Sequence, residues 1–180
     1  MKRVVLSWSS GKDSAWTLYQ LQQSSDVEIV GLLTTINSEF NRIAMHAVRE
    51  ELLNAQAKAA NLQLFKVLLP WPCSNADYEK VIKSEFEKLK LQYDISHIAY
   101  GDLFLEDVRQ YRIDLMQDTG IEALFPIWKT PTKQLAQDML ASGLAAYLTC
   151  VDPKQLSKDF VGTRFNNKFL SSIDENVDHC

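Results

Sequence analysis

Hydrophobic and polar positions follow two different periods along this chain. Short apolar runs that are rich in β-branched residues and bounded by turn residues are typical of buried strands. Stretches in which apolar residues recur every three or four positions are typical of helices. The predicted strands cover Arg3–Ser7, Val27–Thr35, Leu62–Leu69 and His97–Tyr100. The predicted helices cover Lys12–Gln23, Arg42–Ala60, Asn75–Leu91 and Leu103–Met116.

The helix predicted over residues 42–60 depends on apolar residues at intervals of three and four, which place them on one face. These residues are Met45, Val48, Leu52, Ala55 and Ala59. At the start of the first predicted helix, Asp13 or Ser14 is available to cap backbone N–H groups.

The alternation of strands and helices predicts a doubly wound, mostly parallel α/β sheet of the Rossmann-like kind, covered on both faces. After Pro126 the pattern changes. A helix is expected to begin at Thr130-Pro131 and end at Ser142, and Leu144–Val151 is expected to form one more strand. We therefore expect one domain over residues 1–126 and a small C-terminal region over residues 127–180.

Composition narrows the class of protein. Of the 180 residues, 46% are hydrophobic and 23% charged, which is typical of a globular protein. The net charge of -4 argues against a broad basic surface for nucleic acid. No apolar run approaches the roughly 20 residues that span a membrane, and we expect a cytoplasmic protein with no membrane partner. Cys73, Cys150 and Cys180 are too far apart to indicate a disulfide framework or a zinc site.

A serine-rich loop, Ser7-Trp8-Ser9-Ser10-Gly11-Lys12-Asp13-Ser14, joins the first predicted strand to the first predicted helix. Phosphate groups bind where backbone N–H groups, hydroxyls and the positive end of a helix dipole converge. In this loop Gly11 permits close approach of the chain and Lys12 supplies a positive charge. In parallel sheets, ligands bind beyond the carboxyl ends of the strands, which is where this loop begins. We therefore expect the loop to bind the phosphates of a nucleotide.

The loop differs from the common P-loop, because position 6 is Leu and Asp13 stands where Ser or Thr follows the lysine. Its segment Ser9–Ser14 instead resembles the SGGxDS loop of the N-type ATP pyrophosphatases, the PP-loop family, with Ser10 in place of the first glycine. Further segments resemble the bacterial branch of the diphthine–ammonia ligase family. They are Arg42–His46, Gln56-Ala57, Gly101–Arg109, Tyr111-Arg112, Phe125–Trp128 and Val151-Asp152.

This resemblance covers nearly the whole chain, and its most specific stretch is Gly101 to Arg112. It implies an adenine nucleotide alpha hydrolase-like fold and a requirement for ATP with Mg²⁺. It also implies that a carboxylate-bearing acceptor, either a protein or a small molecule, is activated with release of AMP and pyrophosphate. Ammonia or another amine then forms the amide. The C-terminal region over 127–180 would contribute to the substrate site.

Two other classes of function compete with this ligase. One is a nucleotide-binding module that binds ATP or ADP without turnover. The other is an RNA-thiolating enzyme, which needs closely spaced cysteines and a basic RNA-binding region, and neither is present in the sequence. The oligomeric state stays open, with a homodimer as one option.

Glu106, Arg109 and Arg112 are spaced by three residues and share one helix face. Two guanidinium groups there suit a leaving pyrophosphate or a substrate carboxylate, although the same spacing also fits a solvated stripe of charges. With Lys12, these arginines are the expected catalytic residues. Asp102 is expected either to bind Mg²⁺ together with Asp13 or to cap the following helix.

Thr34 and Thr35 are expected to follow the second strand, where adenine or ribose lies in a doubly wound sheet. Three further candidates for the substrate site are His46, Trp128 and Arg164. Each has an ordinary structural alternative: a packed histidine, a core tryptophan and a surface arginine.

The end of the chain adds one expectation. The family pattern continues beyond Val177–Cys180 into a segment that ends in Glu-Phe-His-Thr. We therefore expect a chain that ends at Cys180 to bind ATP or ADP but to turn over poorly, with an irregular structure after about Asp174.

Overall fold

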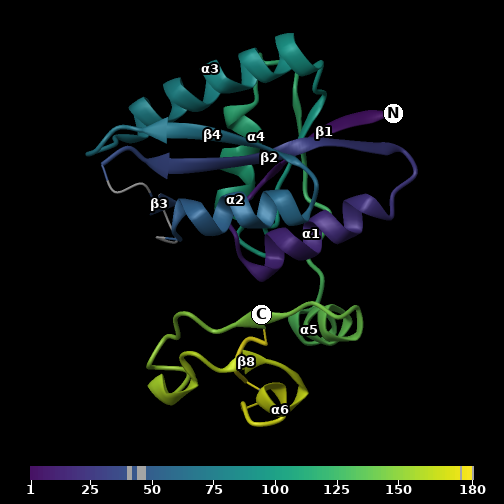
Figure 1. Cartoon of the computed structure of the whole chain (residues 1–180), viewed down its shortest axis with the longest axis vertical. Helices are drawn as coiled ribbons and strands as arrows, with labels where there is room; N and C mark the ends of the chain where they lie inside the picture. Colours follow the sequence, from purple (N-terminus) through teal and green to yellow (C-terminus); the bar gives the residue numbers. More distant parts are fainter. Residues whose placement is uncertain (40–41, 44–47, 175, 180) are drawn as a thin grey trace. The chain divides into compact units, whose positions relative to one another are not determined.

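The computed structural model describes residues 1–39, 42–43, 48–174 and 176–179. Contacts divide the chain into two compact units, Met1–Trp128 and Lys129–Cys180. The first unit contains the large sheet and the second contains a small two-stranded sheet (Figure 1).

Five parallel strands form the main part of the large sheet. They are β1 (Lys2–Ser7), β2 (Val27–Asn37), β4 (Gln63–Leu69), β5 (His97–Ala99) and β6 (Glu122–Leu124). Pairing gives the spatial order β4-β2-β1-β5-β6, and β3 (Arg42–Ile43) runs antiparallel to the far end of β2. This order confirms the predicted doubly wound α/β fold.

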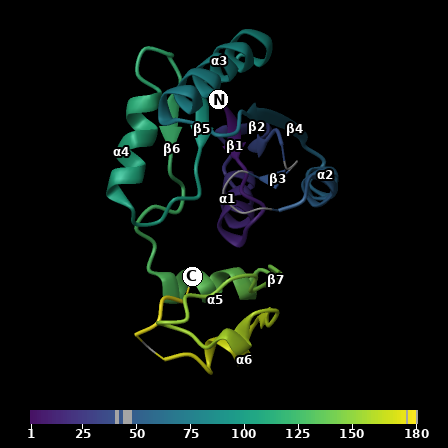
Figure 2. The ribbon, with the colours of Figure 1, turned by 90° about the vertical axis from the view of Figure 1, so that its left-hand side faces the viewer.

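Helices cover both faces of this sheet (Figures 1 and 2). They are α1 (Lys12–Gln22), α2 (Glu50–Ala59), α3 (Asn75–Tyr93) and α4 (Glu106–Leu115). Because side chains alternate along a strand, Val4 and Leu6 pack with residues of α1 and α2, whereas Val5 packs with residues of α3 and α4. The central strand β1 is therefore buried on both faces, as parallel sheets require, whereas the edge strand β4 leaves Lys66 and Leu68 exposed.

The helix predicted over residues 42–60 is only partly correct. It begins at Glu50, because Arg42–Ile43 pair with the end of β2 instead, and residues 44–47, including Met45 and His46, lie outside the described residues. The predicted face is also wrong, since α2 buries Leu53 and Ala57 and leaves Leu52 51% exposed. Leu52 and Leu53 are adjacent, so the apolar pattern fits either of two faces of α2. The alanines are too small to indicate which of these faces packs against the sheet.

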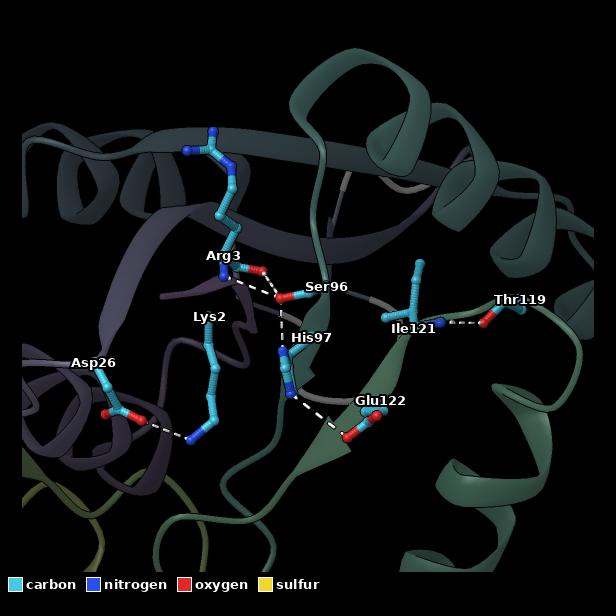
Figure 3. A network of polar contacts seen from close by, with 8 residues as sticks. All are labelled: Lys2, Arg3, Asp26, Ser96, His97, Thr119, Ile121 and Glu122. Atoms are coloured by element: carbon cyan, nitrogen blue, oxygen red, sulfur yellow. Dashed lines mark hydrogen bonds and ion pairs between the residues drawn. The ribbon is translucent and has the colours of Figure 1, made fainter.

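A polar network ties together the beginnings of three neighbouring strands at the amino edge of the sheet (Figure 3). The Ser96 hydroxyl accepts a hydrogen bond from the Arg3 backbone N–H at 3.0 Å and lies 2.7 Å from His97 Nδ1. His97 Nε2 in turn lies 3.6 Å from the Glu122 carboxylate of β6. Lys2 pairs with Asp26 at 2.8 Å beside this group. The network lies at the edge opposite the carboxyl ends of these strands.

The second unit has little regular structure. Its elements are α5 (Thr132–Ala141), β7 (Ala146–Tyr147), a 3₁₀ turn (Lys158–Phe160), β8 (Arg164–Phe165) and α6 (Asn167–Leu170). The strand predicted over Leu144–Val151 shortens to two residues, because β8 offers only two residues to pair with it. Phe160, Phe165 and Phe169 pack together as its aromatic core. Within the described parts of both units, no helix has the length and apolar character needed to cross a bilayer.

Candidate nucleotide-binding site

The strand order reverses between β1 and β5. From β1 the chain proceeds outward to β2 and β4, and it then crosses back to β5 and β6 on the other side of β1. The loops that leave the carboxyl ends of β1 and β5 therefore separate, and a crevice for a ligand forms between such loops. The predicted phosphate loop follows β1, and the Gly101-Asp102 pair follows β5.

The loop Ser7–Ser14 leads directly from β1 into α1. Ser7 ends the strand opposite Leu33, and the Trp8 backbone N–H donates to the Leu33 carbonyl at 2.7 Å. The Trp8 side chain is 5% exposed and anchors the loop in the core beneath α1 and α2. The start of the loop is thus fixed by the sheet itself.

The amino end of α1 carries no side-chain cap among the described residues, and Gly11 is its N-cap residue. The prediction that Asp13 or Ser14 caps the helix is wrong, because the helix begins at Lys12 and both residues lie inside its first turn. The Ser14 hydroxyl instead donates to the Gly11 carbonyl at 2.9 Å. Uncapped N–H groups at the positive end of a helix are suited to a phosphate.

Hydroxyl groups line the inside of the loop. The Ser9 hydroxyl donates to Ser14 Oγ at 3.1 Å and accepts from the Gly11 N–H at 3.3 Å. Ser14 is only 3% exposed, so its hydroxyl is held in one place. Ser10 has a positive φ of 72°, a left-handed conformation that glycine adopts more readily. This is the position at which the PP-loop motif has its first glycine.

Lys12 and Asp13 place opposite charges at the beginning of α1. The Lys12 ammonium lies 2.7 Å from Asp13 Oδ1, and the lysine side chain is 19% exposed. A phosphate at the helix terminus would find the ammonium at the same end, and Mg²⁺ bound to that phosphate would find the carboxylate.

Thr34 and Thr35 lie beside the loop, but within β2 rather than after it, because the strand extends to Asn37. They face opposite sides of the sheet. Thr34 is 3% exposed and shares the face of Leu32 and Ile36, and its hydroxyl has no hydrogen-bond partner among the described residues. Thr34 is therefore the better placed of the two for a ligand near the loop.

Gly101 brings the loop after β5 against the first turn of α1. A β-carbon at this position would lie 3.0 Å from Thr17 Oγ1 and 3.1 Å from the Asp13 carbonyl oxygen. These contacts are tighter than ordinary van der Waals contacts, so a side chain at this position would require its neighbours to shift by a few tenths of an ångström. Asp102 follows directly, and the sequence expectation that it caps α4 is wrong, since Leu105 occupies the N-cap position.

Asp102 is half-buried next to Arg112. Its Oδ2 atom lies 3.7 Å from Arg112 Nε, too far for a hydrogen bond. Burial raises the pKa of Asp102 above its ordinary value, and the positive charge of Arg112 offsets only part of this effect. Neither of these two atoms has a hydrogen-bond partner among the described residues.

Arg109 and Arg112 both stack on aromatic rings. The Arg112 guanidinium lies 4.6 Å from the centre of the Tyr100 ring. The Arg109 guanidinium lies 5.0 Å from the Phe125 ring and 5.3 Å from the Trp128 ring. We call these five residues the arginine–aromatic cluster. Stacking fixes the planes of the guanidinium groups. The buried Nε atoms of both arginines have no hydrogen-bond partner in the described part of the chain.

The cluster can bind an anion at the edges of its guanidinium groups. Leaving a buried donor without a partner costs about 1–3 kcal/mol, so an anionic ligand that satisfies such donors gains free energy. The Tyr78 hydroxyl contributes a weak contact of 3.4 Å to Arg112 Nη1. Burial raises the pKa of Tyr100, which therefore stays a neutral phenol beneath Arg112.

The remaining predicted site residues have different positions. Glu106 is exposed in the first turn of α4, and Trp128 is half-buried in the cluster. Arg164 lies on β8, in the second unit, which is described separately. His46 lies outside the described residues. The structure thus brings the phosphate loop, Thr34 and the Gly101-Asp102 segment to one edge of the first unit.

The donor set fits Mg²⁺ that is bound chiefly through phosphates. In the described residues, no group of three or more His, Cys, Asp or Glu side chains forms a metal cage. Mg²⁺ that accompanies ATP needs only one or two protein carboxylates, which Asp13 and Asp102 would supply.

Sequence reasoning missed the residues that support this site. Gln56 was noted only for its resemblance to the family, yet its amide contacts Trp8 and Ser10 of the loop. Tyr78 and Tyr100, which contact Arg112, were not predicted either. The signal in each case is spatial, because the contacting pairs lie far apart in the sequence.

The strand order and the loop after β1 define the class of protein. It is an α/β protein with a Rossmann-like fold of the adenine nucleotide alpha hydrolase-like kind. A family profile described as the diphthamide synthase N-terminal domain matches residues 1–122. The chain therefore belongs to this family, which is a PP-loop family of ATP-binding proteins, and the predicted family is confirmed. No curated protein matches the chain significantly.

Proposed function

We propose that this protein binds ATP at the loop Ser7–Ser14 and uses it to activate a carboxylate, with release of pyrophosphate. The observation that carries this proposal is the uncapped amino end of α1, with the Lys12 ammonium beside it, at the point where strand order reverses. Family membership supports the ATP part of the proposal, since the family is a PP-loop family. We expect the Thr34 hydroxyl, which has no hydrogen-bond partner among the described residues, to contact the adenosine portion.

In the first step, a carboxylate oxygen of the acceptor attacks the α-phosphorus of ATP. A new P–O bond forms, and the bond from this phosphorus to the oxygen that bridges to the β-phosphorus breaks. Pyrophosphate leaves with that electron pair. The dipole of α1 and the charge of Lys12 stabilise the negative charge that develops on the leaving group. Mg²⁺ bound with the phosphates, held by Asp13 and Asp102, would supply further positive charge.

In the second step, ammonia or another amine attacks the acyl carbon of the adenylate. A C–N bond forms, AMP leaves with the electron pair of the broken C–O bond, and the amine loses a proton to solvent. The products are an amide, AMP and pyrophosphate. The protein's contribution to both steps is to hold the reacting groups close together in a fixed orientation.

The arginine–aromatic cluster offers a second, positively charged contact for an oxyanion of this reaction. Arg109 and Arg112 present fixed guanidinium planes, which suit either a carboxylate or the leaving pyrophosphate. Both ligands are oxyanions, so the cluster supports the reaction class without identifying the acceptor.

The experiment is to incubate the protein with ATP, Mg²⁺, an ammonium salt and a panel of carboxylate compounds, and to separate the nucleotides by chromatography. We expect AMP and pyrophosphate in equal amounts, formed only when a carboxylate is present. ADP and phosphate as the main products would contradict the proposal. Tight ATP binding with no product across a broad panel would instead favour a nucleotide-binding module without turnover.

A further inference from the structure

The side-chain amide of Gln56 joins α2 to the phosphate loop. Its Oε1 atom accepts hydrogen bonds from Trp8 Nε1 at 3.1 Å and from the Ser10 hydroxyl. Its Nε2 atom donates to the Ser10 carbonyl oxygen at 3.3 Å. The oxygen and the nitrogen of the Gln56 amide thus both bond to residues of the same loop, although Gln56 and Ser10 are 46 residues apart.

Ser10 is the residue of the loop that needs such support. Its φ of 72° is left-handed, a conformation that costs a residue with a β-carbon more than it costs glycine. The contacts from Gln56 to its hydroxyl and its carbonyl offset this cost. Where the PP-loop motif has glycine, this chain therefore has a serine held by a glutamine.

The same contact sets the direction of a backbone donor. In a trans peptide, the carbonyl and the following N–H point to opposite sides. Because the Ser10 carbonyl turns toward Gln56, the Gly11 N–H points the other way, where it donates to Ser9 Oγ at 3.3 Å. This peptide leads directly into α1, which begins at Lys12.

Gln56 is itself held on a rigid element. Its neighbours on α2, Leu53 and Ala57, are 0% and 4% exposed and pack in the core with Trp8. A side chain fixed in this way can orient a loop to within a fraction of an ångström, the precision that a binding site requires.

We propose that Gln56 is a positioning residue for the phosphate loop, which it holds in the geometry that receives the triphosphate of ATP. This inference rests on the proposed function and deepens it. Gln56 acts through Ser10 and Trp8 and has no contact with the reacting atoms. Loss of the Gln56 side chain should therefore weaken the binding of ligands that carry the β- and γ-phosphates more than it weakens the binding of AMP.

The test is Gln56→Met, which keeps the volume and flexibility of the side chain and removes its polar atoms. Titration calorimetry should show ATP binding weakened about tenfold, the equivalent of one to two lost hydrogen bonds, and AMP binding weakened less than about threefold. The thermal midpoint should stay close to that of the wild type. Gln134→Met is the matched control, because within the described residues Gln134 is hydrogen-bonded only to Asp138, on the surface of α5.

A second variant tests the link to Ser10. Ser10→Gly removes the cost of the left-handed conformation, and its own measured ATP affinity is the reference for this background. Adding Gln56→Met to this background should weaken ATP binding by only about threefold, because glycine holds the loop geometry without support. If Gln56→Met alone fails to fold, the double variant should recover the fold.

The outcomes separate the two proposals. A wild-type protein that does not bind ATP refutes the proposed function. A wild type that binds ATP, together with a Gln56→Met variant of equal affinity, overturns the role of Gln56 alone. Equal losses for ATP and AMP would also overturn it, because they would indicate a general effect on folding. The same tenfold loss in both backgrounds would overturn it too, because Gln56 would then not act through Ser10.

Discussion

Lys12 and Ser14 are the loop side chains whose loss we expect to weaken nucleotide binding most directly. Replacing Lys12 by Ala removes a charge-assisted contact to phosphate, worth about 1.5–3 kcal/mol, or roughly 10- to 150-fold in affinity. The fold should survive, because among the residues that the structure describes the lysine ammonium pairs only with the neighbouring Asp13. Calorimetric titration with ATP measures the change.

Ser14→Ala removes a hydroxyl that contacts both Ser9 and the Gly11 carbonyl, and it should also weaken ATP binding. Lys58→Ala, in the exposed last turn of α2, is the control for the loss of a lysine. Unchanged affinity in both loop variants would show that the nucleotide binds elsewhere.

Replacing Arg109 or Arg112 by lysine tests whether the planar guanidinium group matters as well as its charge. A lysine in either position retains the positive charge but loses the planar fork and most of the stacking on aromatic rings. We expect Arg109→Lys and Arg112→Lys to slow pyrophosphate release about tenfold, the equivalent of roughly 1.4 kcal/mol, with little change in thermal midpoint.

Pyrophosphate release is measured with a coupled phosphate assay at saturating ATP. Arg49→Lys, at an exposed arginine before α2, is the matched control. If both cluster variants keep the wild-type rate, the guanidinium groups serve only to pack against the rings. A raised KM for the carboxylate, with unchanged product inhibition by pyrophosphate, would assign the pair to the acceptor.

At the residue scale, the sequence predicts candidate side chains for contact with a ligand, a prediction that binding measurements will test, and it missed the residues that support the loop. Lys12 and Ser14 are two positions apart in the sequence and belong to one motif, so their proximity follows from the loop. Gln56 and Tyr78 contact residues 46 and 34 positions away, and nothing local indicates those contacts. Supporting contacts of this kind depend on the packing of whole elements.

Among the elements, strands and long helices follow closely from the pattern, because burial on both faces of a parallel sheet leaves continuous apolar runs. α3 was predicted to within two residues at its end, and its start is fixed by Ser74, which caps the helix. The start of α2 could not be predicted in this way. Residues 42–43 pair with β2, and a two-residue antiparallel strand leaves no periodic signal.

The approach of α1 to the loop after β5 depends on Gly101. Gly101→Ala would place a β-carbon 3.0–3.2 Å from Asp13 and Thr17 of α1, so either α1 or the loop must shift. We expect a loss of about 1–3 kcal/mol in the free energy of unfolding, with weaker ATP binding because the phosphate loop and α1 move together. Urea unfolding and calorimetric titration measure the two effects. Wild-type stability together with wild-type affinity would mean that the close approach is easily relaxed.

The amino edge of the sheet gives a pH-dependent prediction. Burial lowers the pKa of His97 below its ordinary value, and Glu122 restores only part of it. The unfolded chain therefore binds this proton more readily than the folded chain, so His97 makes stability fall as the pH drops through 6.5 toward the folded pKa. Hydrogen bonding from Lys2 lowers the pKa of nearby Asp26 to about 2, so Asp26 keeps its charge throughout this range.

His97→Asn removes this titration and leaves the other histidines in place. The free energy of unfolding of the variant should therefore depend less on pH between about 5 and 7 than that of the wild type. Urea unfolding at several pH values gives both curves. Parallel curves would mean that His97 has the same pKa in the folded and unfolded states.

For the whole molecule, the two units differ in how much core they contain. Both large hydrophobic clusters, which enclose the sheet, are built from residues of Met1–Trp128. The second unit is held chiefly by α5 and a few aromatic contacts. A unit with its own complete core can fold alone, whereas a small unit with little core is marginal in isolation.

We therefore expect a chain that ends at Trp128 to fold and to bind ATP within about threefold of the full chain, less than 1 kcal/mol of difference. The reason is that every described contact of the phosphate loop lies within the first unit. Arg164 is the one predicted site residue that this chain would lose, and Arg164→Ala in the full chain isolates its effect. Calorimetric titration with ATP compares the affinities of the full chain, the chain that ends at Trp128 and the Arg164→Ala variant. If the shortened chain and the Arg164 variant lose affinity equally, by tenfold or more, Arg164 is a phosphate ligand and the site includes the second unit. A loss in the shortened chain alone would assign the contribution to other residues of that unit.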